Sequence, residues 1–421
     1  MTVVGVDDTD SRSEGMCTTF VGTEIANEYT KYGTVSRMLL IRLNPGVEHK
    51  TRGNAAVAIH TDVSPDRAVM IANNIIDKRA VTTDTNTNPG LVVFEDEPAK
   101  VPQAVASFTR SAIRDHLSIE EVENLLDHEN IRHHEWGNGR GKIGATASLG
   151  AWDAIEDWTY EYIAYRKESN WGTNREVNKR SVFQSAEDMY PDAWDTIDRG
   201  EDEMVCVPHT PGPVLFGIRG DSKHAVKTIA QNIESEPTAK TALFYTNQGT
   251  DMHIQQSSLD SVANGRAYEV SGKVTTPPQT KEGGHVFFEI TDNGHSLECA
   301  AFEPTKRFRD HVRKLRPGDY ITVRGEVSNN TLKLEKFAVR ELQQTAKQNP
   351  QCPSCGKNMK SQGADQGFRC RECETFADQK ISTELDRSLE LGWYEVPPCA
   401  RRHIAKPLVR GGYDEPVHIE R

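Results

Sequence analysis

The chain has 421 residues, of which 36% are hydrophobic, and a formal net charge of −12 at pH 7. This length allows about three domains, each large enough to bury a core of its own. No apolar run approaches the ~18 residues that a membrane span needs, and the N-terminus lacks the basic and then apolar pattern of a signal peptide. We therefore expect a multidomain soluble protein of the cytosol and exclude a membrane protein.

A cluster of carboxylates near the N-terminus is the first candidate for catalysis. The apolar residues 2–6 predict a short buried strand, which Asp7, Asp8 and Asp10 follow directly. Apolar residues at fourfold spacing then predict a helix over residues 16–31, with Thr18 in its first turn. Clustered carboxylates repel one another unless a cation lies among them, and a helix N-terminus attracts anions. The stretch therefore predicts a divalent metal ion that holds a phosphate, although Asp and Thr are also ordinary turn and cap residues.

Two loops downstream carry the small and basic residues that bind phosphate chains. In the first, a Lys and an Arg flank a turn; its candidates are Lys50, Arg52, Gly53 and Asn54. The second, residues 137–150, is rich in glycine, which permits close backbone approach to a phosphate. Its candidates are Gly139, Arg140, Gly141, Lys142 and Gly144. Each loop alone is also explained as a solvated turn, but together with the carboxylates they favour a nucleotide-phosphate site.

Two β-α-β patterns indicate the fold of the N-terminal part. The first spans residues 54–95 and the second residues 213–246. We expect both patterns to share one ferredoxin-like sheet into which residues 101–205 are inserted. Within this insertion, Ser118 and Glu121 predict a capping box at the start of a helix.

Two loops of this region supply candidates for a substrate pocket. Residues 168–178 and 245–253 combine aromatic, amide and acidic side chains with glycine, and loops often carry function. The candidates are Trp171, Asn174, Asn247, Gln248 and Asp251.

From residue 266 the pattern becomes all β. Five short strands, with a basic helix between the third and the fourth, follow the order of an OB-fold, which commonly binds single-stranded nucleic acid. Basic residues are concentrated in this helix and in residues 401–410, as suits a protein that touches a polyanion at chosen places. The candidates for nucleic-acid contact are Lys306, Arg307, Arg309, Arg313, Arg401 and Arg402.

Half of the eight cysteines form two CxxC pairs, Cys352 with Cys355 and Cys370 with Cys373. Four thiolates at this spacing favour a closed tetrahedral zinc site over a redox or iron–sulfur site, and such a zinc site is structural because no ligand position stays open. The other four cysteines are scattered singly, so we expect no disulfide framework.

The chain resembles the archaeal 2-agmatinylcytidine synthetases of isoleucine tRNA over essentially its whole length. The resemblance rests on the OB-like segment, the two CxxC pairs and the blocks DDTDSRSEGMCTT, HKTRGNAAVA, GNGRGKIGA, TNQGTD and ARRHIAKPL, in the same order along the chain. It implies an ATP-dependent carbon–nitrogen ligase that attaches agmatine to C2 of the wobble cytidine, so that a CAU anticodon reads AUA. It also implies that Thr18, in a kinase-like domain, accepts phosphate from ATP, with Mg²⁺ held by the aspartate cluster.

We therefore predict a multidomain α+β protein in which a kinase-like α/β catalytic domain is interleaved with a ferredoxin-like domain, followed by an OB-fold barrel and a zinc ribbon. The predicted boundaries are residues 1–53 and 131–200 for the ATP-binding kinase-like domain, 54–130 and 201–257 for the ferredoxin-like domain, 266–345 for the OB-fold, 348–378 for the zinc ribbon and 379–421 for a basic tail.

Two other classes of function stay open at this stage. A non-catalytic single-strand-binding protein explains the OB-fold and the ribbon but leaves the first ~250 residues, two typical domains, without a purpose. A small-molecule kinase explains the phosphate motifs but not the nucleic-acid modules. ATP consumption distinguishes the first from the enzyme, and dependence of that consumption on tRNA distinguishes the second.

Overall fold

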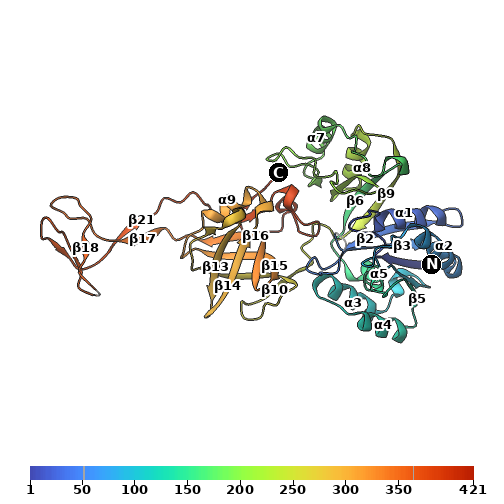
Figure 1. Cartoon of the computed structure of the whole chain (residues 1–421), viewed down its shortest axis with the longest axis horizontal. Coiled ribbons are helices and arrows are strands. Elements are labelled where there is room, and N and C mark those ends of the chain that lie inside the picture. The colour runs from blue at the N-terminus through green and yellow to red at the C-terminus, as the bar shows by residue number, and fades with distance from the viewer. Residues whose placement is uncertain (51–52, 364) are drawn as a thin grey trace.

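The computed structural model describes residues 1–50, 53–363 and 365–421, so the predicted phosphate ligand Arg52 lies outside the described residues. Figure 1 shows a mixed sheet covered by helices, a β-barrel beside it, and a small ribbon at the end of a long two-stranded connection. Within the described ranges, no helix is long and apolar enough to cross a membrane.

In the described residues, the N-terminal part of the chain forms one mixed sheet of nine strands. The strand order is β5-β4-β1-β3-β2-β9-β6-β8-β7. The first half consists of β1 (Thr2–Asp7), β2 (Val35–Arg42), β3 (Ala55–Thr61), β4 (Gly90–Phe94) and β5 (Arg132–Glu135). The second half consists of β6 (Thr159–Arg166), β7 (Ala193–Trp194), β8 (Val214–Gly220) and β9 (Thr238–Thr246). The halves join where β2 runs parallel to β9, with Leu39 opposite Tyr245.

This topology differs from the single ferredoxin-like sheet predicted from the two β-α-β patterns. In the first pattern, β1 lies between β3 and β4 and pairs antiparallel with both. In the second pattern, β6 lies between β8 and β9 in the same way. Each pattern therefore belongs to its own half of the sheet, and the predicted insertion of residues 101–205 into one sheet is wrong. The strand that lies between the two strands of each pattern, β1 or β6, is outside that pattern in the sequence, so no residue within the pattern predicts the pairing. The predicted domain boundaries stay a prediction.

Helices cover both faces of the sheet. On one face, α1 (Thr18–Tyr29) and α2 (Pro65–Arg79) pack against Leu40 and Val57. On the other face, Leu39 and Ala58 are covered by α3 (Gln103–Arg114), α4 (Ile119–His128), α5 (Gly141–Leu149) and α6 (Ala151–Ala154). The second half of the sheet is covered by α7 (Lys179–Asp188) and α8 (Lys223–Asn232). Because neighbouring strand residues point to opposite faces, apolar residues in succession on β2 and β3 serve both layers.

The glycine-rich stretch that we predicted as a loop is in large part the helix α5. A Cβ atom on Gly141, the first residue of this helix, would lie 2.4 Å from the backbone nitrogen of Gly90. A Cβ atom on Gly144 would lie 1.8 Å from Asp7 Oδ2. Neither contact is possible for a side chain, so these glycines let the start of α5 pack directly on β4 and on the end of β1. The capping box of Ser118 and Glu121 at the start of α4 is confirmed.

The predicted OB-fold is confirmed as a closed barrel in which the helix α9 (Phe308–Arg313) lies between the third and fourth strands. Its strands are β11 (Arg266–Val274), β13 (Val286–Asp292), β14 (His295–Ala301), β15 (Tyr320–Ser328) and β16 (Thr331–Glu341). The barrel closes because β14 pairs with β16 and β15 pairs with both β16 and β11. Two short strands, β10 (Ile254–Gln256) and β12 (Gln279–Thr280), flank it.

Residues 379–421, predicted as a basic tail, are largely built into other elements. The strand β21 (Ile381–Glu384) pairs with β17 (Thr345–Gln348) to form the long connection to the ribbon. The strand β22 (Gly392–Glu395) extends the barrel along β16 and pairs with β23 (Val417–His418). The ribbon contains β18 (Lys360–Ser361), β19 (Phe368–Arg369) and β20 (Phe376–Ala377). Short 3₁₀ turns complete the chain: η1 (Pro98–Lys100), η2 (Glu168–Asn170), η3 (Glu282–Gly284), η4 (Glu303–Thr305), η5 (Pro398–Ala400) and η6 (Leu408–Arg410).

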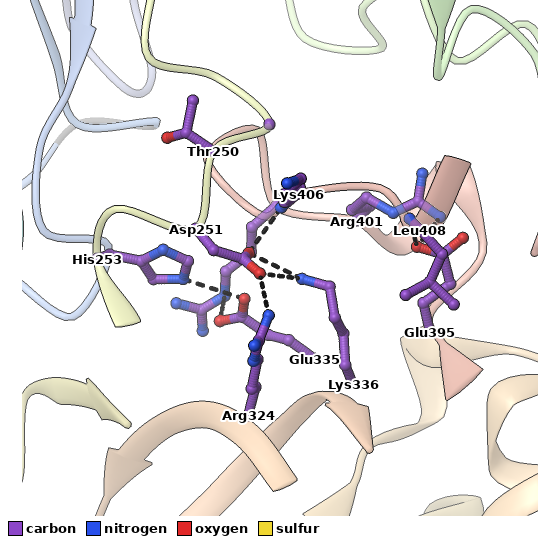
Figure 2. Close-up of polar contacts among 12 residues, drawn as sticks. Thr250, Asp251, His253, Arg324, Glu335, Lys336, Glu395, Arg401, Lys406 and Leu408 are labelled. Carbon is purple, nitrogen blue, oxygen red and sulfur yellow. Dashed lines mark hydrogen bonds and ion pairs between the residues drawn. The ribbon is translucent and has the colours of Figure 1, made fainter. Parts of the chain in front are cut away.

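A buried ion-pair network joins the sheet, the barrel and the C-terminal segment (Figure 2). Asp251, in the turn after β9, accepts hydrogen bonds from Lys336 Nζ at 2.8 Å and from Arg324 Nη1 at 2.9 Å, both on the barrel. It also accepts a hydrogen bond from the backbone N–H of Lys406 at 2.6 Å. Burial alone would raise the pKa of Asp251, but nearby positive charges, that of Lys336 foremost, lower it to about 2. This carboxylate, which we predicted to bind substrate, instead anchors three parts of the chain to one another.

Replacing Lys336 with Met should destabilise the chain by about 3–5 kcal/mol, because it removes one partner of a buried ion pair and leaves Asp251 with less compensating charge. The measurement is the midpoint of urea unfolding of the full chain. The loss should persist from pH 7 down to about 4, the unfolded pKa of Asp, and disappear only as the pH falls toward 2, where Asp251 is itself protonated.

The control is Arg313→Ala, which breaks an exposed pair with Asp310 at 2.6 Å and should change stability by less than about 1 kcal/mol. An unchanged unfolding midpoint for Lys336→Met would contradict the anchoring role of Asp251.

Candidate functional site

Between the two halves of the sheet, the loop after β2 and the C-terminal segment lies a cavity of about 490 Å³. The stretches selected from the sequence as phosphate-binding converge on it, although their outermost residues, Asp7 and Gly144, are 137 positions apart in the chain. The predicted residues that line the cavity are Asp7, Asp8, Asp10, Thr18, Lys50, Gly53, Asn54, Arg140, Gly141 and Gly144.

The aspartate cluster lies at the end of β1. Asp7 is the last residue of this strand, and Asp8 adopts a left-handed φ of 57°. Asp8 Oδ2 accepts a hydrogen bond from the backbone N–H of Asn88 at 3.1 Å. Burial and then the charge of Asp8 raise the pKa of Asp7 well above its usual range, and burial raises the pKa of Asp8 to about 6. These carboxylates carry more negative charge than the chain compensates, and oxygen donors of this kind fit a hard divalent cation such as Mg²⁺.

Thr18 lies next to the carboxylates as the first residue of α1. Its hydroxyl accepts a hydrogen bond from Thr9 Oγ1 at 3.1 Å, and the residue is 5% exposed, on the cavity wall. The positive ends of two helix dipoles, those of α1 and α5, therefore face the same cavity, since Thr18 and Gly141 both line it. The arrangement favours an anion held between the two helix starts.

The predicted basic residues divide between the cavity and other places. Arg140 Nη2 lies 3.4 Å from Asp8 Oδ2 and donates to the carbonyl of Asn86 at 2.6 Å. Lys50 also lines the cavity, where it donates to the carbonyl of Pro45. Lys142 is 1% exposed and pairs with Glu123 and Glu135 outside the cavity, and Gly139 lies in the turn before it. The geometry therefore does not support contact of Lys142 or Gly139 with a phosphate.

A second wall of the cavity carries charged residues that the sequence analysis did not select. Arg42 ends β2, Glu161 lies in β6 and Arg219 in β8. Burial lowers the pKa of Arg42, although the charge of Glu161 partly offsets this effect. Arg42 directly follows the apolar run of residues 38–41, and Glu161 lies between two tyrosines of β6; charged residues are rarely buried without a partner, and this is the signal that would have found both.

The predicted substrate residues lie behind this wall or away from it. Asn247 holds the backbone of Arg42 through two hydrogen bonds of 2.7 and 2.9 Å, and Gln248 donates to Glu161 Oε2. Trp171 packs edge-on against Phe20, with ring centroids 5.2 Å apart, and Asn174 is exposed. None of the residues predicted for the substrate pocket lines the described cavity, and their contact with a substrate stays a prediction.

The four cysteines of the CxxC pairs come together in the ribbon. The ligand atoms of Cys352, Cys355, Cys370 and Cys373 all lie within 4.8 Å of one another, and the Sγ atoms of Cys355 and Cys370 are 3.6 Å apart. Four thiolates at these separations fit a tetrahedral zinc ion with Zn–S bonds of about 2.3 Å. The predicted structural zinc site is thus supported by its geometry.

Comparison with known proteins decides the family. Four family models match the chain: the TiaS TCKD domain over residues 3–138, the TiaS FLD domain over 139–253, the OB-fold nucleic acid binding domain over 268–343 and the TiaS C-terminal zinc ribbon domain over 349–389. The isoleucine-tRNA 2-agmatinylcytidine synthetase TiaS of Haloquadratum walsbyi is 49% identical over 462 aligned residues, which cover 100% of both chains. The chain belongs to the TiaS family.

Solved structures of this family share the whole fold. The crystal structure of TiaS in complex with an isoleucine tRNA and ATP has a TM-score of 0.91 at 41% identity and covers 100% of this chain and 99% of that chain. The complex of TiaS with the same tRNA, AMPCPP and agmatine has a TM-score of 0.88 at 39% identity, with the same coverage. The resemblance inferred from the sequence motifs is confirmed.

Most of the basic residues predicted to contact RNA are engaged in ion pairs with acidic side chains. The side chains of Lys306 and Arg313 are 39% and 35% exposed. The guanidinium of Arg401 is buried among acidic partners. The other four of the six predicted residues form ion pairs with acidic side chains: Arg307 with Glu420 and Asp198, Arg309 with Glu303, Arg401 with Asp195 and Glu395, and Arg402 with Glu326 and Glu335. On the barrel, therefore, Lys306 and Arg313 are the best placed of the predicted set.

Cys355→Ser should abolish stoichiometric zinc binding, because the apolar cluster of the ribbon is very small and a closed thiolate site tolerates no missing ligand. Metal analysis should find one zinc per wild-type chain, and limited proteolysis should cut the variant within the ribbon. The matched control is Cys399→Ser, a cysteine outside the ribbon, which should keep its zinc. Full zinc content in Cys355→Ser would contradict the four-thiolate assignment.

Proposed function

We propose that this chain joins agmatine to C2 of the wobble cytidine in the CAU anticodon of isoleucine tRNA, in an ATP-dependent reaction that forms agmatidine and lets the tRNA decode AUA. The observation that carries the proposal is the convergence of the aspartate cluster, Thr18, Lys50 and Arg140 on one cavity. Family membership supports it, since relatives of this length are named for that synthesis and one solved relative is a complex with an isoleucine tRNA, AMPCPP and agmatine.

The chemistry explains why a phosphate site and a tRNA site must meet. The C2 carbonyl of cytidine is a poor electrophile, and its oxygen does not leave as it stands. Phosphoryl transfer from ATP turns this oxygen into a phosphate ester. The primary amine of agmatine then adds to C2 and loses a proton, and phosphate departs with the oxygen. The protein's task is to position the reactants and to stabilise phosphate charge, as in other phosphoryl transfers.

The cavity residues divide this task among them. Asp7, Asp8 and Asp10 would hold Mg²⁺, which supplies charge neutralisation on the triphosphate when it is bound. Arg140 and Lys50, with the start of α5, contribute further positive charge to the phosphates. Thr18, next to the carboxylates, is the proposed acceptor of a second phosphoryl group, which the chain takes from another ATP with ADP leaving, apart from the transfer to the C2 oxygen.

The C-terminal modules are proposed to hold the tRNA. OB-folds and zinc ribbons suit single-stranded nucleic acid because unpaired bases are splayed out and stack on aromatic rings. On the barrel, Lys306 and Arg313 are the proposed phosphate contacts. Arg307 and Arg309 on the barrel, and Arg402 in the C-terminal segment, are proposed to contribute positive charge in addition to their ion pairs. Arg401 is buried and lines the cavity, so we assign it to the cavity wall and not to an exposed RNA-binding surface.

The direct test is the mass of the modified nucleoside. Incubation of the chain with Mg²⁺, ATP, agmatine and unmodified isoleucine tRNA, followed by nuclease digestion, should give a cytidine heavier by agmatine minus water. Omission of ATP or agmatine is the control. ATP consumed equally without tRNA would instead indicate a small-molecule kinase, and no ATP consumption at all would indicate a binding protein.

Asp8→Asn should reduce tRNA-dependent ATP turnover by at least ~100-fold, since it removes one charge from the site that holds the triphosphate. The matched control is Asp66→Asn, whose carboxylate is exposed and pairs with Arg132, and it should retain full turnover. Full turnover in Asp8→Asn would remove the metal assignment.

Thr18→Ala should abolish labelling of the chain by ATP labelled in its terminal phosphate, because it removes the proposed acceptor oxygen. Thr18→Ser, which keeps the hydroxyl, is the control and should retain the label. Unchanged labelling of Thr18→Ala would remove the acceptor role.

A further inference from the structure

The helix α1, which begins at the cavity, packs closely on the first half of the sheet. A Cβ atom on Gly22 would lie 2.7 Å from a methyl carbon of Val57 in β3, so the helix has no room to shift toward this strand. Three other residues of α1, Phe20, Thr23 and Glu24, contact the second half of the sheet. Because residues three and four positions apart share one side of a helix, one face of α1 forms this junction.

Aromatic rings form the inner part of the junction. Phe20 is 1% exposed, and its ring contacts those of Tyr165 and Trp171 edge-on, at centroid distances of 5.4 and 5.2 Å. The hydroxyl oxygens of Thr23 and Tyr165 are 3.2 Å apart and hydrogen-bonded. Tyr165 lies in β6 and Trp171 follows η2, so both rings belong to the second half. Packed rings of this kind fix the distance between α1 and β6.

Four charged side chains form the outer part of the junction. Glu24 accepts two hydrogen bonds from Arg79, of 2.6 and 2.9 Å, and a third from Lys240 Nζ at 2.8 Å. Arg79, at the end of α2, also donates to Glu168 of η2 at 2.7 Å. Lys240 comes from β9, and its ammonium nitrogen lies 4.2 Å from the centroid of the Phe20 ring. The ion pairs therefore join the two halves at two points, through Lys240 and through Glu168.

Glu24 is the centre of this group of charges. Its side chain is 17% exposed, and burial raises its pKa, but the hydrogen bonds from Arg79 and Lys240 lower the pKa below the ordinary value of Glu. The carboxylate is therefore ionised at neutral pH. It separates two cations that would repel each other without it, and the two-pronged contact with Arg79 fixes its orientation.

The junction lies next to the cavity on both elements that it joins. On α1, the cavity residue Thr18 is two positions before Phe20, and on β6, the cavity residue Ile163 is two positions before Tyr165. With a rise of about 1.5 Å per residue in a helix and about 3.3 Å in a strand, junction and cavity are within about 7 Å along either element. The junction therefore sets the separation of the two cavity walls.

We propose that Glu24 and Lys240 are positioning residues for the proposed reaction, because their ion pair holds the start of α1, with Thr18, at a fixed distance from the second cavity wall. The inference rests on the proposed function. Neither side chain lines the described cavity, so both act through α1 and not through contact with a substrate. A displacement of reacting groups by about 1 Å is enough to lower a rate by roughly 100-fold.

Glu24→Gln tests the proposal in the full chain with tRNA, Mg²⁺, ATP and agmatine. The kcat for agmatidine formation should fall by roughly 10- to 100-fold, with the KM values for ATP and agmatine changed by less than about threefold, because the walls lose their alignment while the substrate contacts remain. The urea-unfolding midpoint is measured alongside, and kcat is compared at a temperature at which every variant is fully folded. There, a merely structural role would leave kcat unchanged.

Variants of Lys240 keep the test independent of the folding of Glu24→Gln. Lys240→Met keeps an unbranched chain beside Phe20 but removes the charge, and it should lower kcat in the same range. Lys240→Arg keeps the charge and should stay within about threefold of the wild type. The double variant Glu24→Gln with Lys240→Met should be no slower than the slower single variant, since both remove one contact. The matched control Glu28→Gln breaks an exposed pair with Lys31 on the same helix and should leave kcat unchanged.

The outcomes separate the positioning role from the proposed function. A wild-type chain that forms no agmatidine would overturn the proposed function itself. A wild-type chain that does form it, with unchanged kcat in folded Glu24→Gln and Lys240→Met, would overturn only the positioning role. A raised KM for agmatine or ATP with unchanged kcat would also overturn that role, because it would indicate a part in substrate binding.

Discussion

The close approach of α5 to the first half of the sheet is the constraint on which the site depends. Three glycines make it possible, since a Cβ atom on Gly90, Gly141 or Gly144 would overlap backbone atoms or the carboxylate of Asp7. The start of α5 and the adjoining Arg140 are thereby brought to the aspartate cluster, at the end of β1. Because α1 begins at the same place, two helix N-termini and three carboxylates surround one volume. Such a site accepts a cation and an anion together more readily than either alone.

Elsewhere in the molecule, buried ion pairs hold its parts together. Asp251 pairs with Lys336 and Arg324, and Asp195 and Glu395 pair with Arg401, so buried ion pairs hold the barrel and the C-terminal segment against the sheet. Of these three basic residues, the sequence analysis had selected Arg401 for contact with RNA. Breaking one buried partner costs several kcal/mol, whereas exposed pairs contribute little. Part of the acidic excess of the chain therefore lies inside, where it neutralises arginine.

Local patterns predicted from the sequence were mostly right, and long-range pairing was not. The cap of α4 at Ser118, the order of the OB-fold and the cysteine spacing depend on neighbours in the chain, which the sequence displays directly. The sheet order depends on which strand enters each β-α-β pattern, and no residue near the pattern records that choice. The same holds for the cavity: Asp7 and Thr18 stood out because they cluster in sequence, whereas Glu161 stands alone among apolar and aromatic neighbours in β6.

The C-terminal segment shows why the barrel and the cavity act as one unit. After β22 has extended the barrel along β16, the chain returns to the sheet, where Pro398, Cys399, Arg401 and His403 line the cavity. The backbone of Lys406 then binds Asp251, the same carboxylate that holds the barrel (Figure 2). The cavity wall is therefore complete only when the barrel is docked, because the residues that close it are tethered to a barrel strand. The OB-fold and the proposed phosphate site are thus joined by contacts that neither part makes alone.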